Sequence, residues 1–168
     1  MQEEDERGVD ERKNLVDIKE READVAQEEA KEAQKEATVA KQEVTQAKEE
    51  LKKVEEEKQT VEKDLEEAKE GLAENPTDKK AQEAVKEAEK KVEEAEEKVE
   101  EAVAKVEEKV EEAEKKAEEA KEAQSFADKK LSEAQTERSE IATDQQKNIA
   151  DAKAEAKMVT TYGLQLVD

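Results

Sequence analysis

Small and apolar residues recur along the first half of the chain in alternating steps of three and four. Only Lys58 interrupts the run with a polar side chain. Steps that average 3.5 residues keep one stripe of a helix facing a partner in a left-handed supercoil. The pattern therefore predicts a long helix with a coiled-coil seam. The expected seam positions are Ala23, Ala26, Ala30, Ala33, Ala37, Ala40, Val44, Ala47, Leu51, Val54, Lys58, Val61, Leu65, Ala68 and Leu72.

The second half of the chain carries a similar stripe and predicts a second long helix. One step, from Val106 to Val110, is four residues where three were due, which is a stutter that should locally relax the supercoil. Glutamates on the outer faces often precede lysines by four residues, which supports a helix. The expected seam positions are Ala81, Val85, Ala88, Val92, Ala95, Val99, Ala102, Val106, Val110, Ala113, Ala117, Ala120, Gln124, Ala127, Leu131 and Ala134.

A single break separates the two patterned halves, and it reads EGLAENPTDKKAQ. Gly71 weakens the last turn of the first helix, and a residue before proline resists the helical conformation. Thr77 or Asn75 is expected to cap the second helix, while Asp78 suits its positive end. We therefore expect a flexible N-terminus over residues 1–10, helices over 11–73 and 80–157, and a hairpin loop over 74–79.

A connection this short makes the two helices antiparallel neighbours. Folding the chain at the break places Leu72 opposite Ala81, and residues 26–40 opposite residues 113–127, where nearly every seam position is alanine. Large residues tend to meet small ones elsewhere, as an interdigitated seam requires. The predicted fold class is all-α, a long antiparallel two-helix coiled-coil hairpin.

The composition of the chain excludes several classes of function. The chain of 168 residues is 49% charged and 1% aromatic, with a net charge of -21. Such a composition is typical of long helices or disordered chains, and the periodicity favours helices. Phosphate binding needs clustered Lys and Arg, so we expect no nucleic-acid partner. The absence of an apolar run of about 20 residues predicts no membrane insertion by this segment.

Candidate chemistry is scarce in this sequence. It contains no His and no Cys, which removes the usual nucleophile–base pairs and zinc sites. Its carboxylates are predicted on exposed helix faces, where nothing shifts their pKa values toward acid–base catalysis. We therefore expect no catalytic residue, no metal site, no cofactor and no small-molecule substrate, and predict that the chain is not an enzyme.

The hairpin tip is the candidate contact site. The tip would project from the end of the two-helix hairpin, and its composition differs from that of the Glu/Lys/Ala/Val-rich helices on either side. Contact there or along the helices would be with a protein partner or with a second copy of the chain. The candidate contact residues are Glu74, Asn75, Pro76, Thr77, Asp78 and Lys79.

The amino-acid composition of the chain changes beyond residue 131. Residues 132–157 are richer in Gln, Asn, Thr and Ser, and residues 158–168 read MVTTYGLQLVD. This last stretch, with β-branched residues and alternating Leu and Val, is typical of a strand. We expect residues 158–168 to be a tail that starts a β-rich domain absent from this chain, which would then be a fragment of a larger protein.

Two segments carry a resemblance to a known family. They are residues 137–152, ERSEIATDQQKNIADA, and residues 162–168, YGLQLVD. Together they resemble the end of the helical region in the spirochaete eighty-three/hundred-kilodalton antigen family. The resemblance implies a charged helical middle region that leads into a C-terminal β-rich domain. It also implies a cell-envelope or periplasmic protein without an assigned activity, and no site residue carries over.

The sequence thus favours a structural or interaction module, namely a coiled-coil arm that serves as spacer or display element of a larger, bacterial envelope protein. One alternative is a stress-protective chain that is disordered in water and helical when dried or lipid-bound. Such chains are usually closer to neutral. Another alternative is a scaffold of parallel helices in a homodimer, which the break at Asn75 and Pro76 disfavours.

Overall fold

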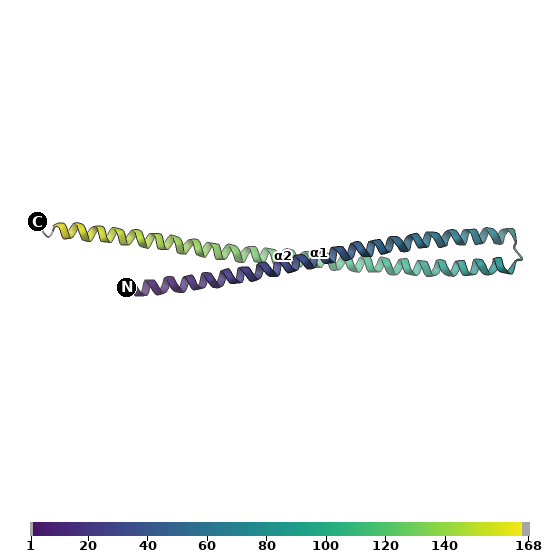
Figure 1. Ribbon diagram of the computed structural model, residues 1–168, viewed down its shortest axis with the longest axis horizontal. Coiled ribbons are helices and arrows are strands. Elements are labelled where there is room, and N and C mark those ends of the chain that lie inside the picture. The colour runs from purple at the N-terminus through teal and green to yellow at the C-terminus, as the bar shows by residue number, and fades with distance from the viewer. Residues whose placement is uncertain (1, 166–168) are drawn as a thin grey trace. The chain divides into compact units, whose positions relative to one another are not determined.

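The protein is a helical hairpin in a computed structural model that describes residues 2–165 (Figure 1). Helix α1 spans Gln2–Glu74 and helix α2 spans Lys79–Gln165, with a four-residue turn between them. Side chains are described for residue 8 and for residues 10–160. No strand occurs among residues 2–165, and the two helices pack against each other. The predicted all-α antiparallel hairpin is therefore confirmed.

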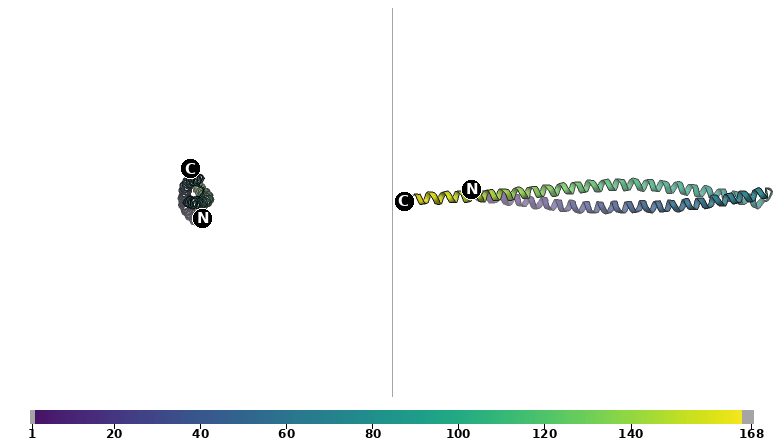
Figure 2. Two further views of the ribbon diagram at one scale, coloured as in Figure 1. Left: turned by 90° about the vertical axis from the view of Figure 1, so that its right-hand side faces the viewer. Right: turned by 90° about the horizontal axis from the view of Figure 1, so that it is seen from above.

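Two compact units divide the hairpin. The loop unit is Ala33–Ala120, and the terminal unit combines Met1–Glu32 with Lys121–Asp168. In the loop unit the teal stretches of α1 and α2 run side by side up to the turn (Figures 1 and 2). In the terminal unit the beginning of α1 packs against α2 through small side chains and ion pairs.

The seam predicted for the first helix is confirmed at every position. All of its residues, from Ala23 to Leu72, are buried or half-buried, whereas their neighbours along the helix are mostly exposed. Lys58 is half-buried like the rest and holds its ammonium group 3.8 Å from the Glu62 carboxylate, one turn further along α1. Its aliphatic stem thus fills the stripe while its charge reaches the edge.

The seam of the second helix is confirmed as far as Ala120, but two later positions were wrong. Gln124 and Leu131 are exposed, and Ala123 and Lys130 take the inward places instead. The reason is that the inward face of α2 keeps a strict seven-residue repeat. One of its two rows is Val85, Val92, Val99, Val106, Ala113, Ala120, Ala127, Ala134 and Ile141.

The stutter expected after Val106 has a different explanation. Lys109 and Lys116 occupy the positions at which the seven-residue repeat continues, and both are half-buried. Val110 and Ala117, each one residue further on, are half-buried as well. The inward face of α2 is therefore wider there, because it includes both lysines as well as Val110 and Ala117. The apolar pattern in the sequence traced only Val110 and Ala117, which made the repeat look interrupted.

Alanine allows the two helices to approach closely in the terminal unit. Ala26, Ala30 and Ala127 form a buried cluster, against which Ala123 also packs. Ala127 has no exposed surface. These contacts confirm, for the terminal unit, the predicted pairing of residues 26–40 with residues 113–127.

Both helices are longer than expected. Helix α1 is already helical at Gln2, where a flexible N-terminus was predicted, and α2 continues past residue 157 to Gln165. Residues 158–165 are helical instead of strand-like; residues 166–168 of that prediction lie outside the described residues. No proline stops the helix, and the hydroxyl of Thr160 donates a hydrogen bond of 2.9 Å to the Ala156 carbonyl. A β-branched residue costs a helix only some tenths of a kcal/mol.

The seam assignment predicts the result of placing charge in it. Replacing Leu51 and Leu65 together by Asp should lower the unfolding free energy of the hairpin by about 2 kcal/mol or more, because two half-buried apolar contacts are lost and carboxylates take their place. Thermal unfolding followed by circular dichroism measures the change. The control Gln59→Asp adds charge to the same helix at an exposed position. An equal loss per added carboxylate in the control would contradict the seam.

Candidate functional site

The tip of the hairpin is a tight turn with defined backbone hydrogen bonds. The amide of Asn75 donates to the carbonyl of Gly71 over 3.2 Å, which is the last helical bond of α1. The amide of Asp78 donates to the carbonyl of Asn75, also over 3.2 Å. Four residues closed by such a bond, with proline in second place, form a β-turn. The chain therefore reverses within residues 75–78.

Asp78 caps the second helix. Its carboxylate oxygen Oδ1 accepts a hydrogen bond of 3.0 Å from the Lys80 amide, and its carbonyl accepts the first helical bond of α2 from Gln82 over 3.1 Å. An acidic residue in this place satisfies an otherwise unpaired amide and matches the positive end of the helix dipole. The prediction that Thr77 or Asn75 would cap the helix was wrong, because the turn takes up both residues.

The side chain of Gln82 ties the turn to the first turn of α2. Its amide group Nε2 donates a hydrogen bond of 3.1 Å to the carbonyl of Pro76. The bond that closes the turn uses the Asn75 carbonyl, so the Pro76 carbonyl is left to accept from this side chain. This contact was not predicted from the sequence, because it depends on the direction in which α2 leaves the turn.

All six candidate contact residues, Glu74, Asn75, Pro76, Thr77, Asp78 and Lys79, are exposed. Asp78 is occupied by its capping bond, while the side chains of Glu74 and Lys79 provide one charge of each sign. The turn thus offers a small, chemically mixed surface of defined shape. That it binds a partner stays a prediction.

The capping assignment predicts unequal effects for two neighbouring substitutions. Asp78→Ala should lower the unfolding free energy by about 1 kcal/mol, since one end of α2 loses its cap. Thr77→Ala, one residue earlier and equally exposed, should change it by less than about 0.5 kcal/mol. Chemical denaturation of both variants measures the difference. A larger loss for Thr77→Ala would show that the cap is misassigned.

Ion pairs between the helices form a ladder in the loop unit that sequence reasoning missed. Three lysines of α2 approach glutamates of α1, and the Nζ–Oε2 distance is 3.2 Å in each pair. Two of these lysines also lie 3.6 Å from a glutamate of α2 one turn further on. The pairs between the helices are Lys105–Glu50, Lys109–Glu43 and Lys116–Glu36.

The terminal unit has its own set of pairs between α1 and α2. The guanidinium group of Arg12 lies 2.8 Å from Asp144, and Lys19 is hydrogen-bonded to Glu137. Two weaker contacts are Arg138–Glu20 at 3.2 Å and Lys130–Glu22 at 3.8 Å. These pairs replace apolar contacts where the second helix turns polar. The signal in the sequence was a seven-residue spacing on both helices, from Arg12 to Lys19 on α1 and from Glu137 to Asp144 on α2.

The glutamates raise the pKa values of their lysine partners. Lys116 has its pKa raised first by the hydrogen bond to Glu36 and then by the charges of Glu36 and Glu119. For Lys109 the hydrogen bond to Glu43 is the largest cause, and for Lys19 it is the hydrogen bond to Glu137. Desolvation acts in the opposite sense on each lysine but is outweighed. The raised pKa values extend the charged state of these lysines, and with it the ion pairs, to higher alkaline pH than is usual for lysine.

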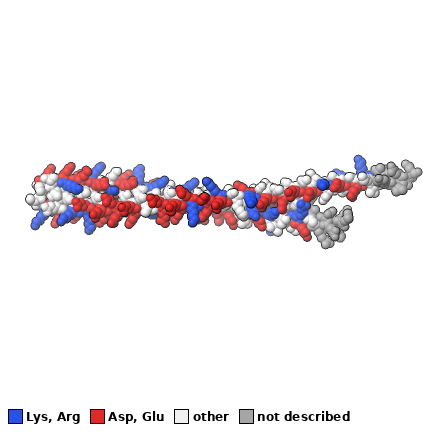
Figure 3. Space-filling view, turned by 180° about the vertical axis from the view of Figure 1, so that it is seen from behind, with Lys and Arg blue, Asp and Glu red and all other residues white. Residues whose placement is uncertain are grey.

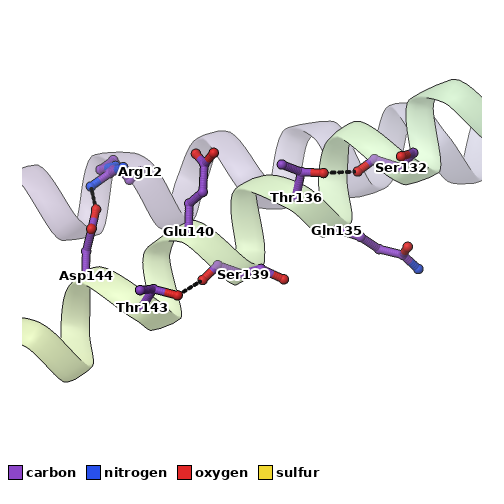
Figure 4. Close-up of a pocket in the computed structure, with 8 residues that line it drawn as sticks. All are labelled: Arg12, Ser132, Gln135, Thr136, Ser139, Glu140, Thr143 and Asp144. Carbon is purple, nitrogen blue, oxygen red and sulfur yellow. Dashed lines mark hydrogen bonds and ion pairs between the residues drawn. The ribbon is translucent and has the colours of Figure 1, made fainter.

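A groove in the terminal unit is lined by hydroxyl and charged side chains (Figure 4). Thr136 and Thr143 donate hydrogen bonds of 2.9 Å to the carbonyls of Ser132 and Ser139, one turn before them on α2. The ion pair of Arg12 with Asp144 lies at one end of the set of residues that line the groove (Figure 4). Both threonine hydroxyls are thus bonded within their own helix.

A second groove of the terminal unit is partly apolar. It is lined by Ile18 and Val25 of α1 and by Phe126 of α2, with charged residues around them. The ammonium group of Lys130 lies 5.4 Å from the centre of the Phe126 ring, within the range of a cation–π contact. The aromatic ring is half exposed and lies against the flank of the seam rather than inside it.

Charge covers most of the remaining surface. Acidic side chains run along the visible face, with basic ones interspersed among them (Figure 3). Among the residues whose side chains are described, no group of three potential metal ligands comes together. Within the described part of the chain, neither helix has a stretch long and apolar enough to cross a membrane.

One comparison with known proteins identifies the family of this chain. A family model described as Borrelia P83/100 protein matches residues 1–166. The chain belongs to this family. Membership confirms the resemblance to the spirochaete eighty-three/hundred-kilodalton antigen family, and the match extends it from the two quoted segments to nearly the whole chain. No curated protein and no solved structure matches the chain.

Family membership places the hairpin within a spirochaete antigen family. The match includes the Ala/Glu/Lys stretches on both sides of the turn, which by themselves are typical of many unrelated coiled coils. The repeat that forms the seam is therefore part of what the family model describes. No functional residue comes with this membership, so function has to be argued from the hairpin itself.

Proposed function

We propose that the chain is a structural coiled-coil arm, which serves as spacer or display element of a larger bacterial envelope protein. The observation that carries the proposal is the division of each helix into an inward stripe and a charged outer surface. All fifteen predicted seam positions of α1 face inward, while the outer faces are charged. Two helices packed in this way form an ordered stem that carries the turn at its end.

The tip is the proposed contact point of the arm. Supporting features are the exposure of residues 74–79 and the hydrogen bonds that hold the turn in one shape. A rigid exposed turn loses little conformational entropy when it binds, which favours recognition by a protein partner. The envelope location follows the family resemblance.

The same proposal assigns no reaction to this chain. The carboxylates whose side chains are described lie on solvated helix faces, cap α2 or form ion pairs such as Glu36 with Lys116. The threonine hydroxyls of the polar groove are bonded to their own helix. Groups in these surroundings are held or solvated rather than poised for proton transfer.

A distance measurement distinguishes an arm from a chain that is disordered in water. Asp24 and Lys129 are exposed and lie on opposite helices of the terminal unit. Since the chain has no cysteine, both can be changed to Cys and spin-labelled. With excess unlabelled protein, we expect one sharp distance below about 40 Å, given the spacing of packed helices. A broad distribution would contradict the arm and favour the disordered chain. A missing signal would favour continuous helices, which separate the labels by about 160 Å.

The contact role of the tip predicts a position-dependent crosslink. A photo-crosslinking amino acid at Thr77, in the full-length protein made by its own bacterium, should form covalent adducts with a partner. The matched control places the same amino acid at Glu94, which is exposed on α2 away from the turn. Denaturing gels reveal the adducts. Equal adducts at both positions, or none at Thr77, would contradict a contact tip.

A further inference from the structure

The last part of α2 carries a second stripe, apolar except for Gln145, most of which the seam with α1 leaves uncovered. Its residues recur in alternating steps of three and four, which is the spacing of a coiled-coil seam. The stripe starts next to Ile141, the last residue of the inward row that begins at Val85, and lies on the neighbouring face of the helix. The stripe consists of Ala142, Gln145, Ile149, Ala152, Ala156 and Val159.

The described structure leaves most of this stripe uncovered. Ile149 is 57% exposed and Val159 is 72% exposed. All residues from 146 to 160 are exposed, and the ion pair of Arg12 with Asp144 lies just before this stretch. An isolated helix of this kind gains little from its own propensity and is usually stabilised by packing an apolar face.

The stripe continues directly from the existing interface between the helices. Ala142 and Gln145 line a groove together with Lys13, Val16 and Asp17 of α1. A helix that packed along the stripe would therefore end in this groove. Part of its binding surface is already shaped by the first seam.

Charge favours a second copy of the same stretch as the occupant. Residues 142–160 contain three acidic residues, Asp144, Asp151 and Glu155, and three lysines. The stretch is therefore neutral, although the whole chain has a net charge of -21. Two copies repel each other through the rest of the chain, but not through this stretch.

The order of residues along the stripe is close to palindromic. In an antiparallel pair, Ile149 of each copy meets Ala152 of the other, and Ala142 meets Val159. Large thus meets small in each of these layers. The flanking positions bring Gln146 beside Lys153 and Asn148 beside Glu155, so that no like charges face each other. The antiparallel order also places residues 121–141 of the two copies at opposite ends of the shared seam.

We propose that residues 142–160 form a two-fold symmetric, antiparallel coiled coil with the same residues of a second copy. The contact is isologous, since the same patch serves both copies. It is short and contains several alanines, so it buries little apolar surface, and the dimer is weak and depends on concentration. The proposed dimer is separate from the tip, and neither proposal needs the other.

Sedimentation velocity of the whole chain, from about 5 μM to about 1 mM, tests the dimer. We expect monomers at low and dimers at high concentration. Ile149→Lys should weaken dimerisation by about tenfold or more, because two copies of the substitution lie in one interface. Met158→Lys is the matched control: Met158 is 64% exposed and lies beside the stripe, so the control should change dimerisation by less than about twofold. Circular dichroism shows whether both variants keep the helices.

A spin label on a single cysteine at Ser139, which is exposed, tests the orientation. In the antiparallel pair Ser139 of one copy lies level with residue 162 of the other, so the labels are at least about 35 Å apart. A parallel pair would bring them within about 20 Å. A chain that stays monomeric at the highest concentration, a dimer that Ile149→Lys leaves unchanged, or a short label distance would each overturn the proposal.

Discussion

Contact between alanine side chains along one face of each helix is the interaction on which the hairpin depends. In the terminal unit Ala26 and Ala30 pack on Ala127, and alanine makes up most of the buried residues described in both units. Each alanine buries little area, and apolar burial contributes roughly 25 cal/mol per Å². Stability therefore accumulates over many turns, and the helices have to be long. Small side chains also let the backbones approach, so that charged side chains next to the seam can reach across it.

Alanines are interchangeable, so the seam alone leaves the pairing of the helices weakly defined. The ion pairs do not remove the ambiguity. Glutamates occur every seven residues on α1, at Glu22, Glu29, Glu36, Glu43 and Glu50, and a shift of one heptad would still bring glutamates to most of the lysines. The turn at residues 75–78 removes this ambiguity. A four-residue connection with a capped second helix allows only one alignment of α2 along α1. The ion pairs favour one rotation of each helix about its own axis, namely the one that brings these lysines and glutamates to the same side of the seam.

The polar change in α2 marks a change of role along the helix. Up to Ala134 its inward face is almost entirely apolar or formed by lysine stems, whereas Glu137 and Asp144 meet basic residues of α1. Beyond Ile141 the apolar residues move to the neighbouring face. A helix that changes its seam in this way can pair with one partner in its first part and with another in its last part. In this member of the Borrelia P83/100 family, the first part of α2 forms the seam with α1, and its last turns carry the stripe proposed to bind a second copy.

The sequence by itself determined the elements, the break and the offset of the two helices. Its period of 3.5 predicted the helices, and the Asn75–Pro76 pair predicted the break between them. Reversing the chain at this break predicted which residues of the two helices lie opposite each other. The tertiary structure decided which of two adjacent residues faces inward. Lys130 lies inward instead of Leu131 and Ala123 instead of Gln124, because the strict repeat of α2 is imposed by α1 and outweighs the polarity of a single side chain. It also decided that Asp78 caps α2, since only the folded turn shows which side chain lies over the first free amide.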